Sequence, residues 1–265
     1  MGNTKKKQNG EALIPLLVFS EENENRKKAE ALAKKLNVVI AETKEDAEKA
    51  NLLLVYNENG LSLVGNEMIL QGDFSDMKRR IRTENLRGEM LVKAAKRKDG
   101  KSNPTAIDAT AGLGEDSFLL AAAGFTVELY EYNPIIAALL QDALERGKED
   151  PEIREIIGRM TLREENSCEA LENRSVPPDV ILLDPMFPSR RKSGLIKKKF
   201  QLLQQLEHPC DNEEALVHAA IKAHPRKIII KRPLKGPYLA GIKPSYSLSG
   251  KAIRYDCLVF AEETK

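Results

Sequence analysis

Short apolar segments alternate with segments of helical periodicity through most of this chain of 265 residues. From residue 105 onward, most apolar runs of strand length are separated by stretches in which apolar positions recur every three or four residues. The expected strands cover residues 105–108, 126–130, 160–163, 180–183, 227–230 and 253–260, and the expected helices cover 116–123, 134–146, 195–206 and 213–223. This alternation predicts a mainly parallel sheet with helices on both faces.

The first eighty residues show a separate pattern of the same kind. The expected strands there cover 13–20 and 38–40, the expected helices cover 22–36 and 45–50, and an expected β-hairpin joins 52–56 to 61–64. The hairpin turn is Asn57-Glu-Asn-Gly60, whose residue types favour turns. We therefore expect a small α/β domain at 1–78, a basic linker at 79–103 that is helical over 89–98, and a larger α/β domain at 104–265.

The composition indicates a globular protein of the reducing cytosol. Hydrophobic residues make up 42% of the chain, and no apolar run approaches the length that crosses a membrane. Residues 1–7 lack the apolar core of a secretory signal. The three cysteines, Cys168, Cys210 and Cys257, have no metal-ligand spacing. We therefore expect a cytoplasmic protein with neither a membrane span nor a bound metal.

A net charge of +2 conceals a strong segregation of charge along the chain. Residues 78–101 carry ten Lys or Arg against three acids, 190–199 carry six without an acid, and 215–255 carry nine without an acid. Such segments predict a positive surface that attracts a polyanion. The alternative is that these charges are solvated on ordinary helices, which would explain each segment taken singly.

The first candidate site is a glycine turn directly after the strand at 105–108. That strand ends in Asp108, and Gly112-Leu-Gly114 follows before the next expected helix. Glycines allow the backbone to approach a ligand closely at such a turn. Many dinucleotide enzymes share this pattern, but Ser117 stands where their fingerprint places a third glycine. The turn therefore favours a nucleoside cofactor that has no pyrophosphate.

Two further strand ends supply polar groups for the same cofactor. Glu131 follows the second strand, nineteen residues after Gly112, where an acid accepts hydrogen bonds from a ribose diol. The alternative for Glu131 is a surface acid at the end of a strand. Asn166 and Ser167 follow the third strand and could meet an adenine edge.

The second candidate site is Asp184-Pro-Met-Phe-Pro188, at the end of the strand at 180–183. Pro185 lacks an N–H group, so the turn offers carbonyl oxygens together with the Asp184 carboxylate. These acceptors could hold both N–H bonds of an exocyclic amine and so orient its nitrogen lone pair. Phe187 could stack on a purine base. The alternative is a loop stiffened by prolines, with Phe187 in the core.

With these motifs, the chain resembles the bacterial S-adenosylmethionine (SAM)-dependent methyltransferases that modify guanine N2 near the 3′ end of small-subunit ribosomal RNA. The matching strings are Asp108-Ala-Thr-Ala-Gly-Leu-Gly114 with Asp116, Glu131-Tyr-Asn-Pro134, Asp184-Pro-Met-Phe-Pro188, Ser193-Gly-Leu-Ile-Lys-Lys198 and Lys231-Arg-Pro233. The resemblance covers roughly residues 79–260. It implies a Rossmann-like class I methyltransferase fold, SAM as the cofactor and 16S ribosomal RNA or the small ribosomal subunit as the partner.

The resemblance also implies roles for individual residues. Cofactor contacts carry over to Glu115, Asp116, Glu131, Tyr132, Asn166, Ser167 and Asp184, in addition to Asp108, Gly112 and Gly114 of the turn. Asp184, Pro185 and Phe187 become the catalytic group. Glu115 and Tyr132 stand where the family commonly has basic residues. The first eighty residues match the family poorly, so their role stays open.

The basic residues beside these motifs are the candidates for RNA contact. They are Arg79, Arg80, Arg190, Arg191, Lys192, Lys197, Lys198, Lys231 and Arg232. Such cations would meet the phosphates that flank a target base, and that base would have to be unstacked to expose its amino group.

Three other functions remain open from the sequence. An N-methyltransferase for another amine, such as adenine N6 or a protein side chain, would need the same acceptors. A non-catalytic RNA-binding assembly factor could use the fold without the chemistry, although Asp184 and the glycine turn are intact. A dehydrogenase is less consistent, because the third glycine is missing and no suitable His or Tyr-x-x-x-Lys pair is present.

Overall fold

The computed structural model describes residues 16–20, 23–65, 68–97, 102–185 and 212–260. The chain forms two compact units, Met1–Ile69 and Leu70–Lys265. The expected helix at 195–206 lies outside the described residues.

The N-terminal unit is built around a small sheet with the strand order β2-β1-β3-β4-β5. Its elements are β1 (Leu16–Ser20), η1 (Asn23–Asn25), α1 (Arg26–Leu36), β2 (Val39–Ile40), α2 (Lys44–Glu48), β3 (Leu52–Asn57), β4 (Gly60–Gly65) and β5 (Met68–Leu70). β1 pairs in parallel with β2 and β3, and the expected hairpin of β3 and β4 is confirmed as an antiparallel pair. The sequence did not predict β5, which has three residues.

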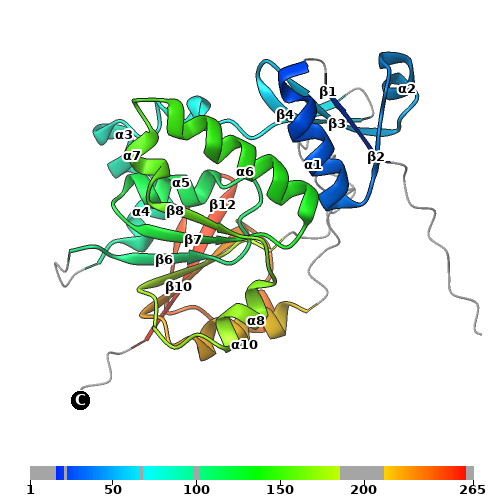
Figure 1. Cartoon of the computed structure of the whole chain (residues 1–265). Coiled ribbons are helices and arrows are strands. Elements are labelled where there is room, and N and C mark those ends of the chain that lie inside the picture. Colours follow the sequence, from blue (N-terminus) through cyan, green and yellow to red (C-terminus); the bar gives the residue numbers. More distant parts are fainter. Residues whose placement is uncertain (1–15, 21–22, 66–67, 98–101, 186–211, 261–265) are drawn as a thin grey trace, which may run out of the picture. The chain divides into compact units, whose positions relative to one another are not determined.

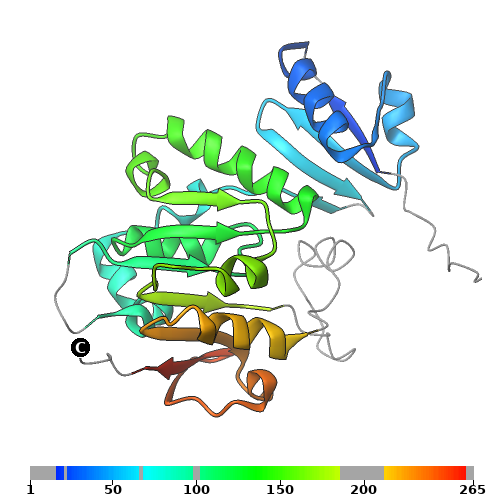
Figure 2. The ribbon, with the colours of Figure 1, turned by 60° about the horizontal axis from the view of Figure 1, so that its bottom comes forward.

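The second unit contains a seven-stranded sheet with the order β11-β12-β10-β9-β6-β7-β8. The strands are β6 (Thr105–Asp108), β7 (Thr126–Tyr130), β8 (Met160–Arg163), β9 (Val180–Leu183), β10 (Lys227–Pro233), β11 (Tyr246–Ser249) and β12 (Ile253–Val259). β6 to β10 are parallel, and β12 runs antiparallel to both β10 and β11. Figure 2 shows this succession from β8 to the red β12. The predicted, mainly parallel sheet is confirmed.

Helices cover both faces of this sheet (Figure 1). They are η2 (Ser75–Met77), α3 (Thr83–Gly88), α4 (Met90–Ala95), α5 (Glu115–Ala122), α6 (Pro134–Glu149), α7 (Arg154–Ile157), α8 (Ser167–Glu172), α10 (Glu213–Lys222) and η3 (Leu239–Gly241). Figure 1 places α4 to α7 on one face and α8 with α10 on the other. The sequence did not predict α3, α7, α8 or the edge strand β11.

Alternate residues of the strands supply the two cores, as expected for a sheet buried on both faces. Ala106, Leu182 and Ile229 belong to the core that includes residues of α4, α5 and α6. Ile107, Ile181 and Ile228 belong to the core on the side of α8 and α10. This alternation determines the face toward which each side chain at a strand end projects.

The basic segment after η2 differs from the single helix expected at 89–98. It forms two short helices, α3 and α4, because Glu89 between them has an extended backbone with φ −62° and ψ 129°. Both Glu89 carboxylate oxygens accept hydrogen bonds from the Arg80 guanidinium, at 2.7 and 2.9 Å. This pair ties the junction of α3 and α4 to the segment that follows η2.

Within the described ranges, the helices are too short or too polar to cross a membrane. In the same part of the chain, no cluster of three or more His, Cys, Asp or Glu side chains is suited to hold a metal ion.

Candidate active site

The strand order places the candidate site at the point where the chain changes direction across the sheet. β6, β7 and β8 proceed toward one edge, whereas β9 and β10 continue from β6 toward the other. Ligands of open α/β sheets bind beyond the carboxyl ends of the strands at such a point. Asp108 ends β6, Asp184 follows β9, and Lys231 lies near the end of β10, so the three residues come from adjacent strands.

These three side chains project toward the same face of the sheet. Side chains two residues apart on a strand share a face. Asp108, Asp184 and Lys231 each lie two residues after a member of the α4–α6 core, namely Ala106, Leu182 and Ile229. The N-terminus of α5 lies above them, and its Asp116 completes the group, as the following contacts show.

Lys231 joins two carboxylates at the centre of the site. Its Nζ lies 2.7 Å from Asp116 Oδ2 and 2.9 Å from Asp184 Oδ2. The exposed fractions are 26% for the Lys231 side chain, 16% for Asp116 and 38% for Asp184. Asp184 is therefore the member of this cluster that is most accessible to a ligand.

The backbone of Asp184 is held independently of its side chain. Its N–H donates to Thr110 Oγ1 over 2.6 Å. The neighbouring Ala109 N–H donates to the Leu182 carbonyl over 3.0 Å, which ties the glycine turn to β9. Pro185 follows and has no N–H group. The turn after β6 and the acid after β9 thus form one connected unit.

The glycine turn has the conformation that its glycines favour. Gly112 has φ 54° and Gly114 has φ 76°, both in the left-handed region. A Cβ at Gly114 would lie 2.8 Å from Leu140 Cδ1 and 3.3 Å from Phe74 Cζ. A Cβ at Gly112 would meet nothing within 4 Å. Gly114 is therefore required by packing, whereas Gly112 borders open space.

Asp108 is buried beneath this turn. It accepts hydrogen bonds from Ser117 Oγ at 2.6 Å and from the Thr110 N–H at 3.2 Å. Burial, together with the nearby carboxylates of Asp116 and Asp184, raises the pKa of the Asp108 carboxyl to about 7 against the opposing effect of these hydrogen bonds. Asp108 is 2% exposed, so it braces the turn from within.

Glu131 connects the end of β7 to the same turn. Its Oε2 accepts a hydrogen bond from the Gly112 N–H at 3.0 Å, and its Oε1 accepts one from the Asn133 N–H at 2.8 Å. Burial raises the pKa of Glu131, and these backbone donors oppose the rise. A carboxylate has about four lone-pair sites, so both oxygens retain acceptor capacity for a diol.

The charges at the centre of the site influence one another. Burial raises the pKa of Asp184, while the Lys231 ammonium acts in the opposite direction. Burial alone would lower the pKa of Lys231, but the Asp116 and Asp184 carboxylates outweigh it and raise that pKa. Lys231 therefore remains a cation throughout the physiological range.

The other expected cofactor residues occupy the same edge of the sheet in different ways. Glu115 is exposed in the first turn of α5, and Tyr132 is 64% exposed after β7. Asn166 Oδ1 caps α8 by accepting a hydrogen bond from the Cys168 N–H at 2.9 Å. Ser167 begins α8. The capping role of Asn166 is one that the sequence did not suggest.

Several cations that the sequence assigned to RNA are engaged inside the protein. Arg232 is 1% exposed, its Nε donates to the Pro237 carbonyl at 2.9 Å, and its Nη1 lies 3.5 Å from Glu213 Oε1. The prediction of a phosphate contact by Arg232 is therefore wrong, because its side chain has no access to solvent. Lys231 lies in the carboxylate cluster, and Arg80 pairs with Glu89.

Acids remote in the sequence also neutralise the basic segments. Lys78 pairs with Asp150 at 2.8 Å, and Arg97 and Arg226 both pair with Asp179, at 2.9 and 3.3 Å. The acid-poor segments are therefore less positive in the fold than in the sequence. Arg79, in contrast, is exposed.

Some candidate residues lie outside the described part of the chain. They are Phe187, Arg190, Arg191, Lys192, Lys197 and Lys198. Two other residues of the site, Thr110 and Tyr255, were not singled out from the sequence, and Ser117 was noted there only because it replaces a third glycine. Thr110 falls within the glycine-turn motif, whereas Tyr255 is brought to the site by the pairing of β12 with β10.

The chemistry of this edge fits SAM. SAM carries a cationic sulfonium, a cationic α-ammonium group and a ribose diol, all of which favour acidic hydrogen-bond acceptors. The acids available here are Glu115, Asp116, Glu131 and Asp184, whereas Asp108 is buried and supports the turn. The open space at Gly112 allows a ligand to approach the backbone, and Glu131 beside it would hold the ribose.

Comparison with known proteins supports the same assignment. A family model of SAM-dependent methyltransferases matches residues 31–260. A crystal structure of a SAM-dependent methyltransferase from Neisseria gonorrhoeae superposes with a TM-score of 0.71 at 28% identity, covering 92% of this chain and 95% of that chain. The expected class I fold is therefore confirmed.

Curated relatives are similar over part of their length. Ribosomal RNA small subunit methyltransferase J from Pseudomonas savastanoi pv. phaseolicola is 44% identical over 170 residues, which is 64% of this chain and 63% of the relative. The protein of that name from Stutzerimonas stutzeri is 45% identical over 170 residues, 64% of this chain and 66% of the relative. Each match thus spans less than two thirds of the relative.

The match of the family model covers the carboxylate cluster, the glycine turn and both acids at the ends of β7 and β9. The expectation of SAM as the cofactor class agrees with both the family and the donor set. This chain belongs to the SAM-dependent methyltransferase family.

Proposed function

We propose that this protein is a cytoplasmic enzyme that methylates the exocyclic N2 of a guanine in the 16S ribosomal RNA of the small subunit. The observation that carries the proposal is the position of Asp184. Its carboxylate follows β9 at the switch point, its N–H is fixed by Thr110, and it is the most exposed acid of the Lys231 cluster. The curated relatives with 44–45% identity carry the name ribosomal RNA small subunit methyltransferase J.

The residues of the site support catalysis mainly by positioning. Asp184 Oδ2 is occupied by Lys231 at 2.9 Å, which leaves Oδ1 to accept an N–H bond of the guanine amine. The turn at Pro185 lacks a backbone donor, so it does not compete with the amine for this acceptor. Holding the amine in this way directs its lone pair, and such orientation accounts for a large part of many enzymatic rate enhancements.

The proposed reaction transfers one methyl group to the guanine amine and releases one proton from it. SAM, when bound, would supply an activated methyl group: the N2–C bond would form as the S–C bond breaks, with S-adenosylhomocysteine as the second product. The guanine amine loses one proton as it is alkylated. Asp184 stabilises the developing positive charge and accepts that proton or passes it to water. No strong base is needed, because the amine becomes acidic during alkylation.

The test uses tritiated SAM and small subunits purified from cells that lack this protein. Wild type, Asp184→Ala and Asp76→Ala would be compared, since Asp76 is an exposed acid outside the cluster. After digestion to nucleosides, we expect label in N2-methylguanosine with wild type and Asp76→Ala, and a loss of at least about 10²-fold with Asp184→Ala.

Other outcomes would assign a different function. Label in N6-methyladenosine would retain the site and change the target base. Label in protein would identify a side-chain amine as the substrate. An absence of label in RNA and protein, with normal binding of S-adenosylhomocysteine, would contradict the enzymatic proposal and favour an assembly factor.

A further inference from the structure

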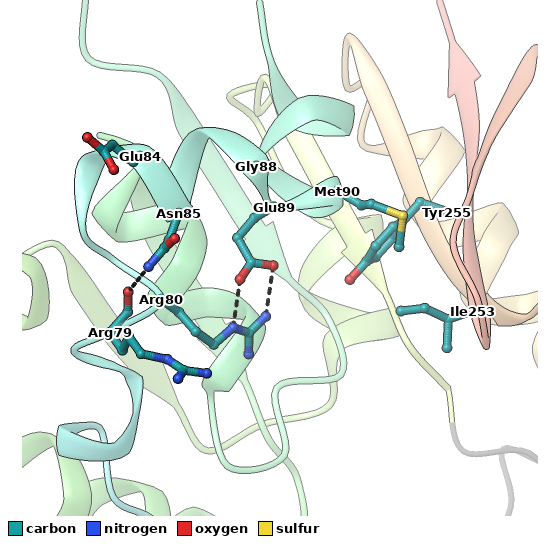
Figure 3. A pocket seen from close by; sticks show the side chains of 9 residues that line it. All are labelled: Arg79, Arg80, Glu84, Asn85, Gly88, Glu89, Met90, Ile253 and Tyr255. Atoms are coloured by element: carbon teal, nitrogen blue, oxygen red, sulfur yellow. Dashed lines mark hydrogen bonds and ion pairs between the residues drawn. The ribbon is translucent and has the colours of Figure 1, made fainter.

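A pocket of about 680 Å³ lies between the α3–α4 segment and β12. Figure 3 shows Met90, Ile253 and Tyr255 on one side of it and Arg79, Glu84 and Asn85 on the other. None of these residues is among the expected cofactor contacts. The pocket belongs to the second unit and is separate from the glycine turn in sequence.

One wall of the pocket is apolar and well supported. Met90 and Ile253 are partly buried and pack against the α4–α6 core, to which Tyr255 itself belongs. The Met90 thioether lies over the backbone of Gly250, where a Cβ would be 2.6 Å from Met90 Cε. Tyr255 is 4% exposed. A supported apolar wall of this kind suits the face of a nucleobase.

The opposite wall is polar, and its exposed charged residues are Arg79 and the acid Glu84. Arg80 and Glu89 satisfy each other through two hydrogen bonds, so this pair contributes little net charge. Among the described residues, the exposed Arg79 guanidinium has no ion-pair partner. Asn85 Nδ2 donates to the Arg79 carbonyl at 2.8 Å, which fixes the backbone from which Arg79 projects. Arg79 is thus placed to meet a phosphate at the pocket rim.

The pocket adjoins the carboxylate cluster through the sheet. Tyr255 on β12 is the direct register partner of Lys231 on β10. Side chains that are directly opposite in an antiparallel pair have Cβ atoms about 5 Å apart. Lys231 in turn contacts Asp184 and Asp116. Lys231 therefore connects the wall at Tyr255 to Asp184, the acid proposed to hold the amine.

We infer that this pocket receives the target guanosine of the RNA, with the base against Met90 and Ile253 and a flanking phosphate on Arg79. This inference rests on the proposed function and deepens it. In a paired stem, cytosine holds one N–H bond of the guanine amine, so the nucleoside must leave the stack for both N–H bonds to be free, and it needs a surface that replaces the lost stacking. The apolar wall, which is connected to Asp184 through Tyr255 and Lys231, supplies that surface.

A substitution at Gly88 can block the pocket without changing any of the expected cofactor-binding residues. It lines the pocket, and a Cβ built on it meets nothing within 4 Å. Gly88→Phe would therefore place a ring in the pocket space. Thr83→Phe is the matched control, because Thr83 is an exposed residue of the same helix that does not line the pocket.

The measurements are the steady-state kinetics of methyl transfer to undermethylated small subunits and calorimetric titration with S-adenosylhomocysteine. We expect Gly88→Phe to lower kcat/KM for the subunits at least tenfold, with cofactor affinity within twofold of wild type. Thr83→Phe should resemble wild type in both measurements. Equal kcat/KM for Gly88→Phe and wild type would overturn the inference.

Arg79→Gln and Arg82→Gln form a second pair, which decides the question if Gly88→Phe does not fold. Arg82 is also exposed and adjoins the same helix, but it does not line the pocket. Arg79→Gln should reduce the slope of log binding constant against log salt by about one, as expected for one lost phosphate contact. An unchanged slope, or an equal loss with Arg82→Gln, would contradict the assignment of Arg79.

A separate measurement distinguishes failure of the proposed function from failure of the pocket inference. It is the binding of guanosine 5′-monophosphate to protein saturated with S-adenosylhomocysteine. If wild type does not methylate subunits, the function proposal fails by itself. The pocket inference then stands if the nucleotide binds wild type and Thr83→Phe but not Gly88→Phe. It is overturned if the nucleotide binds none of them, or binds all of them equally.

Discussion

The Lys231 ammonium lies 2.9 Å from a carboxylate oxygen of Asp184. The same ammonium lies 2.7 Å from Asp116 at the N-terminus of α5, so it couples the cofactor side of the site to the proposed amine acceptor. Because Lys231 fixes one Asp184 oxygen, the other oxygen is oriented without a direct contact between Lys231 and the substrate. We therefore assign Lys231 a positioning role and not a phosphate contact.

Lys231→Met should lower kcat and shift its pH dependence. Burial raises the pKa of Asp184, and Lys231 counteracts that rise. Removing the cation should raise the pKa of Asp184 further. Since Asp184 accepts an N–H bond in its ionised form, the acidic limb of the kcat profile should move to higher pH. At neutral pH we expect a loss of roughly 10²-fold, comparable with the effect of misplacing a reacting group.

Two variants distinguish positioning from a general loss of stability. Lys231→Arg keeps the cation and should restore the acidic limb, although with altered geometry. Lys227→Met removes a lysine from the other end of β10, where Nζ donates to the Ala94 carbonyl at 2.6 Å. Lys227→Met should lower the free energy of unfolding and leave the acidic limb of the kcat profile at its wild-type pH. If the acidic limb of the kcat profile of Lys231→Met lies at the same pH as that of wild type, the positioning role is contradicted.

Glu131→Ala should weaken cofactor binding. It removes the carboxylate proposed to hold the ribose and leaves the N–H groups of Gly112 and Asn133 without this acceptor. Hydrogen bonds to charged groups contribute about 1.5–3 kcal/mol, so the Kd of S-adenosylhomocysteine should rise by roughly one to two orders of magnitude. Calorimetric titration gives this Kd directly.

Glu128→Gln is the matched control for that experiment. Glu128 lies on β7, the strand that Glu131 follows, but it forms a bidentate pair with Arg174, at 2.7 and 3.0 Å. Its replacement should lower the free energy of unfolding and leave the Kd of S-adenosylhomocysteine near the wild-type value. Equal changes in Kd for the two variants would indicate a general effect of β7 and argue against a ribose contact.

Alanine substitutions at the two turn glycines should separate binding from stability. Both residues have positive φ, so each substitution carries a backbone cost of about 1–2 kcal/mol. Gly114→Ala adds a clash with Leu140 at 2.8 Å, and overpacking typically costs a further 1–3 kcal/mol. Gly112→Ala meets open space, so its larger effect should be on the affinity for S-adenosylhomocysteine.

Urea unfolding and calorimetric titration of both variants test this division. Gly114→Ala should show the larger fall in the free energy of unfolding. Gly112→Ala should show the larger rise in Kd, measured where both proteins are folded. If Gly112→Ala binds the cofactor as wild type does, the space beside Gly112 is not the path by which the ligand approaches the backbone.

Most of the sheet could be predicted from the sequence, because buried parallel strands are short, apolar and punctuated by turns. The predicted bounds of β6, β7, β8 and β9 agree with the structure residue for residue. Helix α8 was missed because Asn166 was interpreted as a ligand contact, although its side chain caps that helix. β11 was missed because its residues, Tyr246–Ser249, are largely exposed and form an edge strand.

The roles of the cations could not be predicted from local charge. Arg232 is buried against Glu213, nineteen residues earlier in the chain, and Lys78 pairs with Asp150, which lies 72 residues later. Such neutralisation depends on tertiary contacts between distant segments. The contribution of Tyr255 to the site likewise depends on the antiparallel pairing of β12 with β10. Sequence patterns locate strand ends, but they do not determine which charged side chains meet there.

Asp108 should make the stability of the cofactor-free protein depend on pH. Its pKa is raised to about 7 in the folded protein, against about 3.9 in an unfolded chain. Between these values the folded state binds a proton that the unfolded state has released. The stabilisation from protonated Asp108 is therefore complete below about pH 4 and is lost as the pH rises toward 7, by about 1.4 kcal/mol per pH unit.

Asp108→Asn tests this by removing the titration while keeping the shape of the side chain. Its amide oxygen can still accept a hydrogen bond from the Thr110 N–H. The Ser117 hydroxyl, which donates to Asp108 Oδ2 in the structure, can rotate to accept a hydrogen bond from the amide NH₂ group. Urea unfolding at pH 5, 6, 7 and 8 should show the variant gaining stability relative to wild type up to about pH 7 and then levelling off. A difference that stays constant across this range would mean that Asp108 is already ionised in the folded protein at pH 5, and that the turn is braced by a buried carboxylate and not by a neutral acid.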